Sequence, residues 1–363
     1  MMIETEADLS AAIAEASGPL QLRGGGTRDL GREGVGDVVS TAGLCGVTLY
    51  EPGALTLVAQ AGTPVAEIEA TLEAEGQRLA FEPYFLGGRD GSTIGGVVAT
   101  NASGPRRIQA GAARDFLLGV RFVDGRGTVI KNGGRVMKNV TGYDLVKVMA
   151  GSWGTLGVLT EVSLKVMPRP ETEATLALED LSAEAAVAAM SGALSSPFDV
   201  SGAACVGGRT LIRVEGFEAS VAYRVAQLQS KLAAFGSSEV VAQDWSLVRD
   251  ARALRDGAGD IWRISVTPSD GPGVIARLPE RSETQMDWGG GLVWARVPSG
   301  TDVRAAIHGV SGHATVMRAA AETHARLGSF QPEAPGVAAL SAGLRARFDP
   351  RGILNPGLMA VAA

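Results

Sequence analysis

The chain has 363 residues, of which 45% are hydrophobic and 20% are charged, and its formal net charge is −6. These values exclude a disordered chain, and the lack of a basic tract removes the usual electrostatic signature of nucleic-acid binding. Its two cysteines, Cys45 and Cys205, are too few for a disulfide scaffold or a cysteine-bound iron–sulfur cluster.

The N-terminal segment predicts a helix over residues 4–17, with Thr5 as its N-cap, because apolar residues recur there at helical spacing. The segment is acidic and amphipathic, unlike a signal peptide. No apolar run in the chain approaches the roughly 18 residues that a membrane-spanning helix needs. We therefore expect a cytoplasmic protein, which partners could still hold at a membrane.

A short strand at 20–22 leads into a cluster of three glycines, RGGGTR at 23–28. Backbone N–H groups can converge on a phosphate in such a turn, and a bulky side chain would block that approach. The cluster is not a Walker A loop, since no Gly-Lys-Ser/Thr follows, and it lacks the spaced glycines of a Rossmann turn. It predicts a phosphate-binding loop, with a flexible hairpin loop as the alternative.

The next elements are predicted as strands at 38–40 and 47–50 around a turn, followed by a strand at 55–61. A helix should then run to about Gly76, with Thr63 as N-cap and Pro64 as its first residue.

Residues 81–161 are rich in glycines separated by short apolar runs. Within them, residues 92–96 predict a buried helix start with little side-chain bulk, open to an anion, or else a tight helix–sheet contact. The rest of the stretch predicts, in order, a hairpin of 116–124 with 127–131, a polar turn at 138–144, a helix at 145–149 and a strand at 158–166.

The sequence pattern changes after Pro168 and Pro170, where we place the first domain boundary. From there on, predicted strands alternate with alanine-rich helices. This pattern predicts an α+β layer, with a sheet covered on one face. The predicted strands are 174–178, 205–214, 261–266, 291–297 and 314–318; the helices are 183–194, 219–235 and 334–347; and polar linkers are expected at 267–274 and 279–284.

Together, these motifs resemble the FAD-binding domain of the vanillyl-alcohol-oxidase type flavoproteins, also called the PCMH-type fold. More narrowly, the chain is similar to the FAD-binding subunits of glycolate oxidase. The resemblance is carried by RGGGTR at 23–28, STIGGVVATNASGPRR at 92–107, NVTGYDLVKVMAGSWGTLGVLTE at 139–161 and FDPRGILNPG at 348–357. It implies an α+β fold: a two-subdomain PCMH-type FAD-binding domain over 1–170, an α+β cap domain with a mostly antiparallel sheet over 171–345, and a tail over 346–363 that returns to the FAD domain.

The resemblance also implies which residues bind FAD. The pyrophosphate would be held by Gly24, Gly25, Gly26, Thr27 and Arg28 on one side and by Ser92, Thr93, Gly95 and Gly96 on the other; Gly104 and Gly111 would pass close to the flavin; and Gly154, Thr155, Gly157 and Val158 would lie along the adenosine and ribityl-diphosphate part. Relatives with covalent flavin use a histidine, but the chain has none before His308, and Thr27 stands where one would follow the glycines. We therefore expect non-covalent FAD.

Oxidation of a 2-hydroxy acid requires a cation for the carboxylate and a group that activates the α-carbon. The candidates for these roles are His313, Arg106, Arg107, Arg263 and Arg318. His308 and His324 are expected on exposed helical faces. Cys45 is expected to be a packing thiol. Trp153 and Trp262 are expected to pack in the protein rather than stack on a ligand. No metal site is predicted, because the paired histidines of the related catalytic subunit are missing.

The resemblance implies an FAD-dependent oxidoreductase acting on the CH–OH group of a 2-hydroxy acid such as glycolate. Its partners would be a second flavoprotein subunit and an iron–sulfur subunit that receive the electrons. Two alternatives stay open: a non-catalytic assembly subunit that keeps the flavin fold, and a stand-alone FAD-dependent D-2-hydroxy-acid dehydrogenase.

Overall fold

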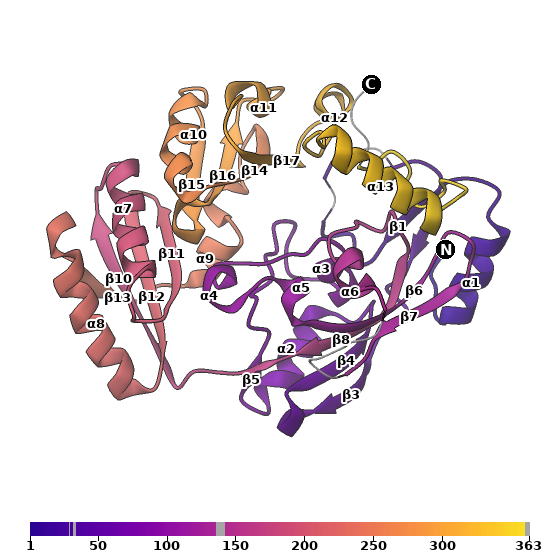
Figure 1. Cartoon of the computed structure of the whole chain (residues 1–363), viewed down its shortest axis with the longest axis horizontal. Coiled ribbons are helices and arrows are strands. Elements are labelled where there is room, and N and C mark those ends of the chain that lie inside the picture. Colours follow the sequence, from indigo (N-terminus) through magenta and orange to yellow (C-terminus); the bar gives the residue numbers. More distant parts are fainter. Residues whose placement is uncertain (29, 32–33, 136–141, 360–363) are drawn as a thin grey trace.

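The computed structural model describes residues 1–28, 30–31, 34–135 and 142–359 (Figure 1). The turn predicted at 138–144 therefore lies outside the described residues as far as 141. Where the chain is described, no helix is long and apolar enough to cross a membrane.

The first half of the chain forms a mixed layer of short helices around a five-stranded sheet. The sheet has the order β3-β4-β8-β6-β7, and its neighbouring strands are antiparallel. Beside it, β1 and β2 pair in parallel, and β5 pairs with β9. The strands are β1 Leu20–Arg23, β2 Asp37–Ser40, β3 Val47–Glu51, β4 Thr56–Gln60, β5 Gln77–Arg78, β6 Leu117–Val123, β7 Val129–Gly133, β8 Val158–Lys165 and β9 Met167–Pro168; the helices are α1 Glu6–Glu15, η1 Pro52–Ala54, α2 Val65–Glu73, α3 Ile94–Ala99, α4 Arg107–Ala110, α5 Ala113–Phe116 and α6 Leu145–Met149.

The second half contains an eight-stranded sheet of order β13-β10-β12-β11-β15-β16-β14-β17, in which all recorded pairs are antiparallel. The strands are β10 Thr172–Glu179, β11 Val200–Val206, β12 Arg209–Gly216, β13 Glu239–Val241, β14 Asp260–Val266, β15 Glu283–Asp287, β16 Leu292–Val297 and β17 Gly312–Arg318; the helices are α7 Ala183–Leu194, α8 Glu218–Leu232, η2 Ala233–Phe235, α9 Trp245–Arg249, η3 Arg252–Leu254, η4 Pro268–Asp270, α10 Gly271–Arg277, η5 Trp288–Gly290, α11 Val303–Ala306, α12 Ala321–Leu327 and α13 Pro335–Phe348.

The two faces of this sheet have different neighbours. Buried side chains of α7, α8, α10 and α11 pack on one face, such as Met190 and Leu228. The other face contributes Ile261, Trp294 and Met317 to the core of the first half. The predicted α+β fold with a sheet covered by helices on one side is confirmed, and the second half lies directly against the first.

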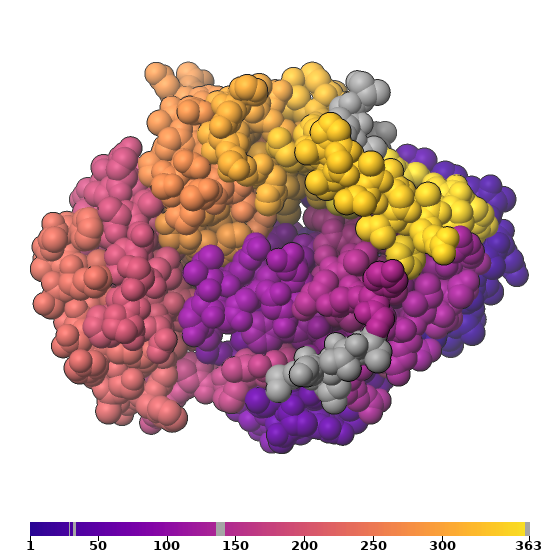
Figure 2. Space-filling view, in the orientation of Figure 1, coloured from indigo at the N-terminus to yellow at the C-terminus, as the bar shows by residue number. Residues whose placement is uncertain are grey.

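The C-terminal segment crosses back to the first half. In Figure 2 the yellow residues lie across the magenta part of the chain and reach the indigo N-terminal part. Leu20 N donates to Ile353 O at 2.7 Å, and the Arg351 guanidinium donates to Ala16 O and Gly125 O, at 3.1 and 2.9 Å. These bonds join the residues after α13 to β1, to the end of α1 and to the turn between β6 and β7.

Several local predictions are confirmed for the expected physical reason. Thr5 Oγ1 accepts from Asp8 N and caps α1. The hairpin β6–β7 forms as antiparallel partners around residues 124–128. Helices α6, α7 and α13 also begin and end within one residue of their predicted limits.

Other local predictions are wrong. Residues 205–214 are two strands and not one, because Gly207 and Gly208 both have positive φ and form a two-residue turn between β11 and β12. Strands β2 and β3 belong to different sheets instead of sharing a turn. Residues 267–274, expected as a linker, form η4 and the start of α10, each with a proline in its first turn.

Three side chains also differ from expectation. Thr63 does not cap α2, because its hydroxyl donates to Gln60 O at 2.7 Å and also bonds to Gly46. Cys45 is exposed, since its neighbour Leu44 takes the buried position. His324 is buried and not exposed: its Nδ1 lies 2.9 Å from Ser329 Oγ and its Nε2 lies 2.5 Å from Leu30 O.

Candidate functional site: a glycine-lined cleft and an arginine cluster beside it

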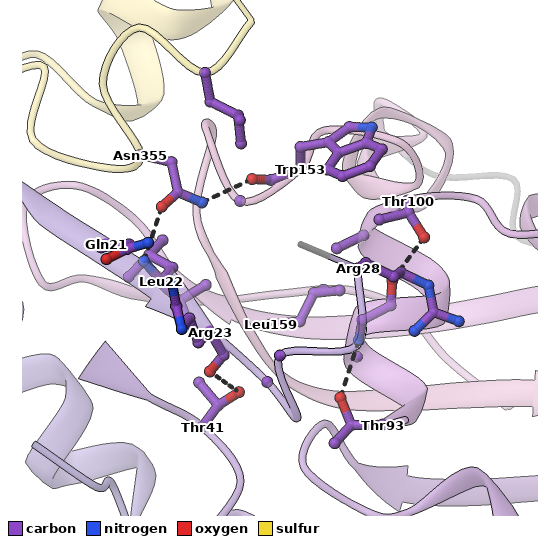
Figure 3. Close-up of a pocket in the computed structure, with 18 of the residues that line it drawn as sticks. Gln21, Leu22, Arg23, Arg28, Thr41, Thr93, Thr100, Trp153, Leu159 and Asn355 are labelled. Atoms are coloured by element: carbon purple, nitrogen blue, oxygen red, sulfur yellow. Dashed lines mark hydrogen bonds between the residues drawn. The ribbon is translucent and has the colours of Figure 1, made fainter. Parts of the chain in front are cut away.

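A cleft of about 1230 Å³, open solvent included, lies where β1, α3, the start of β8 and the C-terminal segment meet (Figure 3). Residues 21–28 line one side of it. Further lining residues come from 93–100, 153–159 and 355–358. These are four segments far apart in the sequence, so the cleft exists only in the folded chain.

The loop after β1 packs so closely on its neighbours that side chains are excluded. A Cβ atom on Gly25 would lie 1.4 Å from Gly91 O, and one on Gly24 would lie 2.5 Å from Thr93 Oγ1. The glycines at these two positions therefore follow from a close backbone approach and not from loop flexibility. Their exposed backbone leaves this wall of the cleft free of side-chain bulk.

Arg28 ends this loop as a partly buried cation. Its Nη1 donates to Ser92 Oγ at 2.9 Å and its Nη2 donates to Tyr84 O at 3.3 Å. Among the described residues, its Nε has no hydrogen-bond partner and no carboxylate pairs with it. Burial lowers the pKa of this guanidinium. Arg28 thus places a positive charge beside the glycine loop, with no counter-ion from the described part of the chain.

The C-terminal segment completes the cleft through Asn355, which the sequence did not single out. Leu22 N donates to Asn355 Oδ1 at 2.8 Å, and Asn355 Nδ2 donates to Trp153 O at 2.9 Å (Figure 3). Asn355 therefore joins β1 to the turn before β8. Its only sequence signal was its place in the motif FDPRGILNPG.

The structure brings most of the predicted cofactor residues to this cleft. The lining residues among them are Gly24, Gly25, Gly26, Thr27, Arg28, Thr93, Gly95, Gly96, Gly154, Gly157 and Val158. Four others do not line it. Ser92 stands behind Arg28, Thr155 Oγ1 donates to Ser152 O, Gly111 lies against Asp115, and Gly104 O accepts from Trp288 Nε1 at 2.9 Å.

The five predicted catalytic candidates divide into two groups. Arg106 and Arg318 have partners: Arg106 Nη1 donates to Glu215 Oε1 at 2.7 Å, and Arg318 Nη2 donates to Arg255 O at 2.5 Å. Arg107 and Arg263 instead converge on the ring of Trp288. His313 is exposed at the start of β17, yet partial burial of its ring, and then the charges of Arg263 and Arg107, lower its pKa.

Asp287, next to Trp288, is the most strongly shifted carboxyl at this place. It is 2% exposed, and burial raises its pKa to about 7, although Trp288 N donates to it at 2.7 Å. Between about pH 4, its unfolded value, and pH 7, the folded chain holds a proton that the unfolded chain has released. The free energy of unfolding therefore falls as pH rises through this window, by at most about 1.4 kcal/mol per pH unit.

We expect the unfolding free energy of Asp287→Asn not to fall between about pH 4 and pH 7 as it does in the parent protein. The amide keeps the acceptor oxygen for Trp288 N and carries no charge at any pH. The variant should match the parent protein near pH 3.5, below the unfolded pKa of the carboxyl, and exceed it in unfolding free energy at pH 8, as measured by urea unfolding at each pH. Asp256→Asn, at an exposed position, is the control and should leave the profile unchanged. Parallel profiles for the parent and Asp287→Asn would show that Asp287 is ionised in the folded chain.

Metal ligation has no support in the part of the chain that the structure describes. No group of three or more His, Cys, Asp or Glu side chains is close enough there to hold a metal ion.

Comparison with known proteins agrees with the geometry of the cleft. A family model described as an FAD binding domain matches residues 1–133. The chain is 36% identical over 354 residues to the glycolate oxidase subunit GlcE of Escherichia coli (strain K12), covering 97% of this chain and 95% of that protein. It is also 38% identical over 122 residues to the glycolate oxidase subunit GlcD of Bacillus subtilis (strain 168), covering 34% of this chain and 25% of that protein.

Two solved structures share the fold at low sequence identity. Alkyldihydroxyacetonephosphate synthase superposes with a TM-score of 0.72 at 16% identity, covering 98% of this chain and 76% of its own. p-Cresol methylhydroxylase with substrate bound superposes with a TM-score of 0.72 at 12% identity, covering 99% and 88%. The predicted PCMH-type fold is therefore confirmed over almost the whole chain.

Proposed function

The chain belongs to the family of the glycolate oxidase subunit GlcE, and on that premise we propose that it binds FAD non-covalently and takes part in oxidising glycolate or a related 2-hydroxy acid. The observation that carries the proposal is the cleft with a glycine wall and a partly buried Arg28, which pairs with no carboxylate of the described residues. Such a cleft suits a long ligand with a negatively charged middle, as FAD is.

The donor set fits the cofactor. Gly24, Gly25 and Gly26 present backbone where a pyrophosphate has to come close, and Arg28 supplies the charge. Thr93 Oγ1 accepts from Gly96 N at 3.3 Å and keeps the start of α3 in place against this loop. Asn355 and Trp153 form the far side. Bound FAD would accept the hydride that leaves the substrate, which carries both electrons.

Oxidation of glycolate to glyoxylate releases two electrons and two protons, so the electrons must leave the subunit. Cys45 and Cys205 are the only cysteines in the chain, and a cluster bound by cysteines needs more. We therefore propose that the chain works in a complex with a GlcD-like flavoprotein subunit and a GlcF-like iron–sulfur subunit.

The colour of the purified protein tests the cofactor. We expect a flavin-type visible spectrum, and acid precipitation should release all of the flavin into the supernatant because no residue links to it. A colourless chain that gains no flavin spectrum with added FAD would refute the proposal. Flavin that stays with the precipitate would refute the non-covalent link alone.

Addition of glycolate or D-lactate under anaerobic conditions tests the chemistry. We expect the visible absorbance to bleach, either in the chain alone or after its partner subunits are added. Flavin that bleaches only in the partner subunits would mean that this chain is an assembly subunit, and the oxidoreductase proposal would then be wrong.

A further inference from the structure

Two arginines from different halves of the molecule meet at one indole ring. Arg107 begins α4 in the first half, and its Cζ lies 4.4 Å from the centroid of the Trp288 ring. Arg263, on β14, places its Cζ 4.9 Å from the same centroid and 6.0 Å from that of Trp294. Each guanidinium carbon lies within about 5 Å of one centroid, and the charge of Arg263 lowers the pKa of Arg107, so the two cations influence each other.

The indole ring of Trp288, which contacts both guanidinium groups, lies between the two halves of the molecule. Trp288 is 4% exposed, and its Nε1 donates to Gly104 O at 2.9 Å, three residues before Arg107 in the chain. Arg107 and Trp288 therefore keep their relative position by a short path through residues 104–107 and this hydrogen bond.

Neither guanidinium has an anionic partner in the part of the chain that the structure describes. No hydrogen bond or ion pair to either is recorded there, and Arg263 Nε is buried without a partner. Other arginines nearby differ: Arg106 pairs with Glu215, Arg213 with Glu82, and Arg249 with Asp250. A guanidinium held away from water without a counter-ion is costly, so the half-buried Arg107 and Arg263, with its buried Nε, are suited to bind an anion from outside.

The surrounding groups leave the positive charge uncompensated. Burial lowers the pKa of Arg263, and burial followed by the charge of Arg263 lowers the pKa of Arg107. Asp287 acts on Arg263, but burial raises the pKa of this carboxyl to about 7, which weakens it as a counter-ion. Tyr84 also faces Arg263, His313 faces both arginines, and Arg114 and Asp115 act with opposite signs on Arg107.

Trp294 and Tyr84 connect this cluster to the glycine-lined cleft. The ring of Tyr84 stacks edge-on against Trp294 at 5.5 Å, and Tyr84 O accepts from Arg28, which lines the cleft. An anion bound at the two arginines would therefore lie next to the cleft without occupying its glycine wall.

We propose that Arg107 and Arg263 bind the carboxylate of the 2-hydroxy acid, with Trp288 as the apolar floor of the site. Each planar guanidinium offers a pair of N–H donors that matches the two oxygens of a carboxylate. Cation–π contact with the indole ring of Trp288 helps to hold both guanidinium groups in position. The inference rests on the proposed function, because it assigns the substrate's carboxylate to residues of this chain and not to a partner subunit.

Calorimetric titration with oxalate, a dicarboxylate that carries no oxidisable hydroxyl, tests this assignment on the purified chain with its FAD. We expect the parent protein to bind oxalate, and Arg107→Gln and Arg263→Gln each to raise the dissociation constant by about tenfold or more, since each removes charged hydrogen bonds. Arg107→Lys should recover part of the affinity, as it restores the charge without the fork. Arg114→Gln removes a positive charge from a side chain that is about half exposed and should stay within about twofold.

The FAD spectrum and the thermal midpoint of each variant are recorded alongside. Arg107 is only half-buried, so its variants test the proposal even where Arg263→Gln fails to fold. Absence of oxalate binding in the parent protein, or unchanged affinity in the Arg107 variants, would overturn the assignment. Variants that lose FAD but keep oxalate would overturn it too, because the arginines would then serve the cofactor.

Failure of the proposed function would look different. A colourless chain that gains no flavin spectrum with added FAD would disprove FAD binding, whereas oxalate titration can be carried out on that chain and still reports on the two arginines. A yellow chain that glycolate bleaches, but whose arginine variants bind oxalate normally, would disprove this inference alone.

Discussion

Replacing Gly25 by alanine should weaken FAD binding by about 100-fold or more. The new Cβ atom would stand 1.4 Å from Gly91 O and 2.5 Å from Gly91 C, which are backbone atoms that cannot rotate away. Either the glycine loop or the 87–91 segment must therefore move. The loop is also the wall of the cleft, so a shift of its backbone takes N–H groups away from the pyrophosphate. Titration of the FAD-free protein with FAD, followed by flavin fluorescence, measures the effect.

Alanine variants of two further glycines, Gly24 and Gly18, should lose less FAD affinity than Gly25→Ala. In Gly24→Ala the clash is with Thr93 Oγ1, a hydroxyl that can rotate at the cost of its bond from Gly96 N, so a smaller loss is expected. Gly18→Ala is the matched control, because a Cβ atom at Gly18 meets nothing within 4 Å. The order of FAD affinity should be Gly18→Ala, Gly24→Ala, Gly25→Ala, from strongest to weakest. Equal affinities for all three would mean that the cofactor does not rest on this loop.

The glycine wall could be predicted because its cause is local. A strand followed by Gly24-Gly25-Gly26 needs little else to mark a close backbone approach, and the short helix after Thr93 shows its lack of bulk in the sequence itself. Elements with strong periodicity or clear caps, such as α1 and α7, could be predicted for the same reason.

The other side of the cleft could not be predicted in this way. Asn355 acts through Leu22 and Trp153, and these contacts depend on where the C-terminal segment ends up after folding. Strand β15, with the sequence ETQMD, has no apolar alternation and forms because β11 and β16 flank it. In both cases the decisive contact joins residues far apart in the chain.

The adjacent residues Arg106 and Arg107 show the same limit most clearly. The sequence made them equal candidates, yet one is 8% exposed and paired with Glu215, while the other lies on Trp288 without a carboxylate. Their separation depends on α4, which begins between them and turns the two side chains to different partners. Only the position of the second half against the first decides which arginine is available to a ligand.

The contact between the two halves depends on Arg213, and we expect Arg213→Met to cost about 3–5 kcal/mol of unfolding free energy. The Arg213 side chain is 2% exposed, on β12. Its two Nη atoms donate to the two carboxylate oxygens of Glu82, at 3.0 and 2.9 Å, and its Nε donates to Ser201 Oγ at 3.1 Å. Methionine fills much of the volume but leaves Glu82 without its main cation, and burial already raises the pKa of Glu82.

The same strand provides the control for this prediction. Arg209 is also on β12, but its pair with Glu179 is exposed, so Arg209→Met should cost less than about 1 kcal/mol. The network extends through Glu215, which accepts from Arg78 at 2.6 Å and from Arg106 at 2.7 Å, so the charges of both halves depend on one another. The double variant Arg213→Met with Glu82→Gln should therefore recover part of the loss, because it removes the stranded charge as well. Urea unfolding of the four proteins measures this, and an equal cost for Arg213→Met and Arg209→Met would show that the buried network does not hold the halves together.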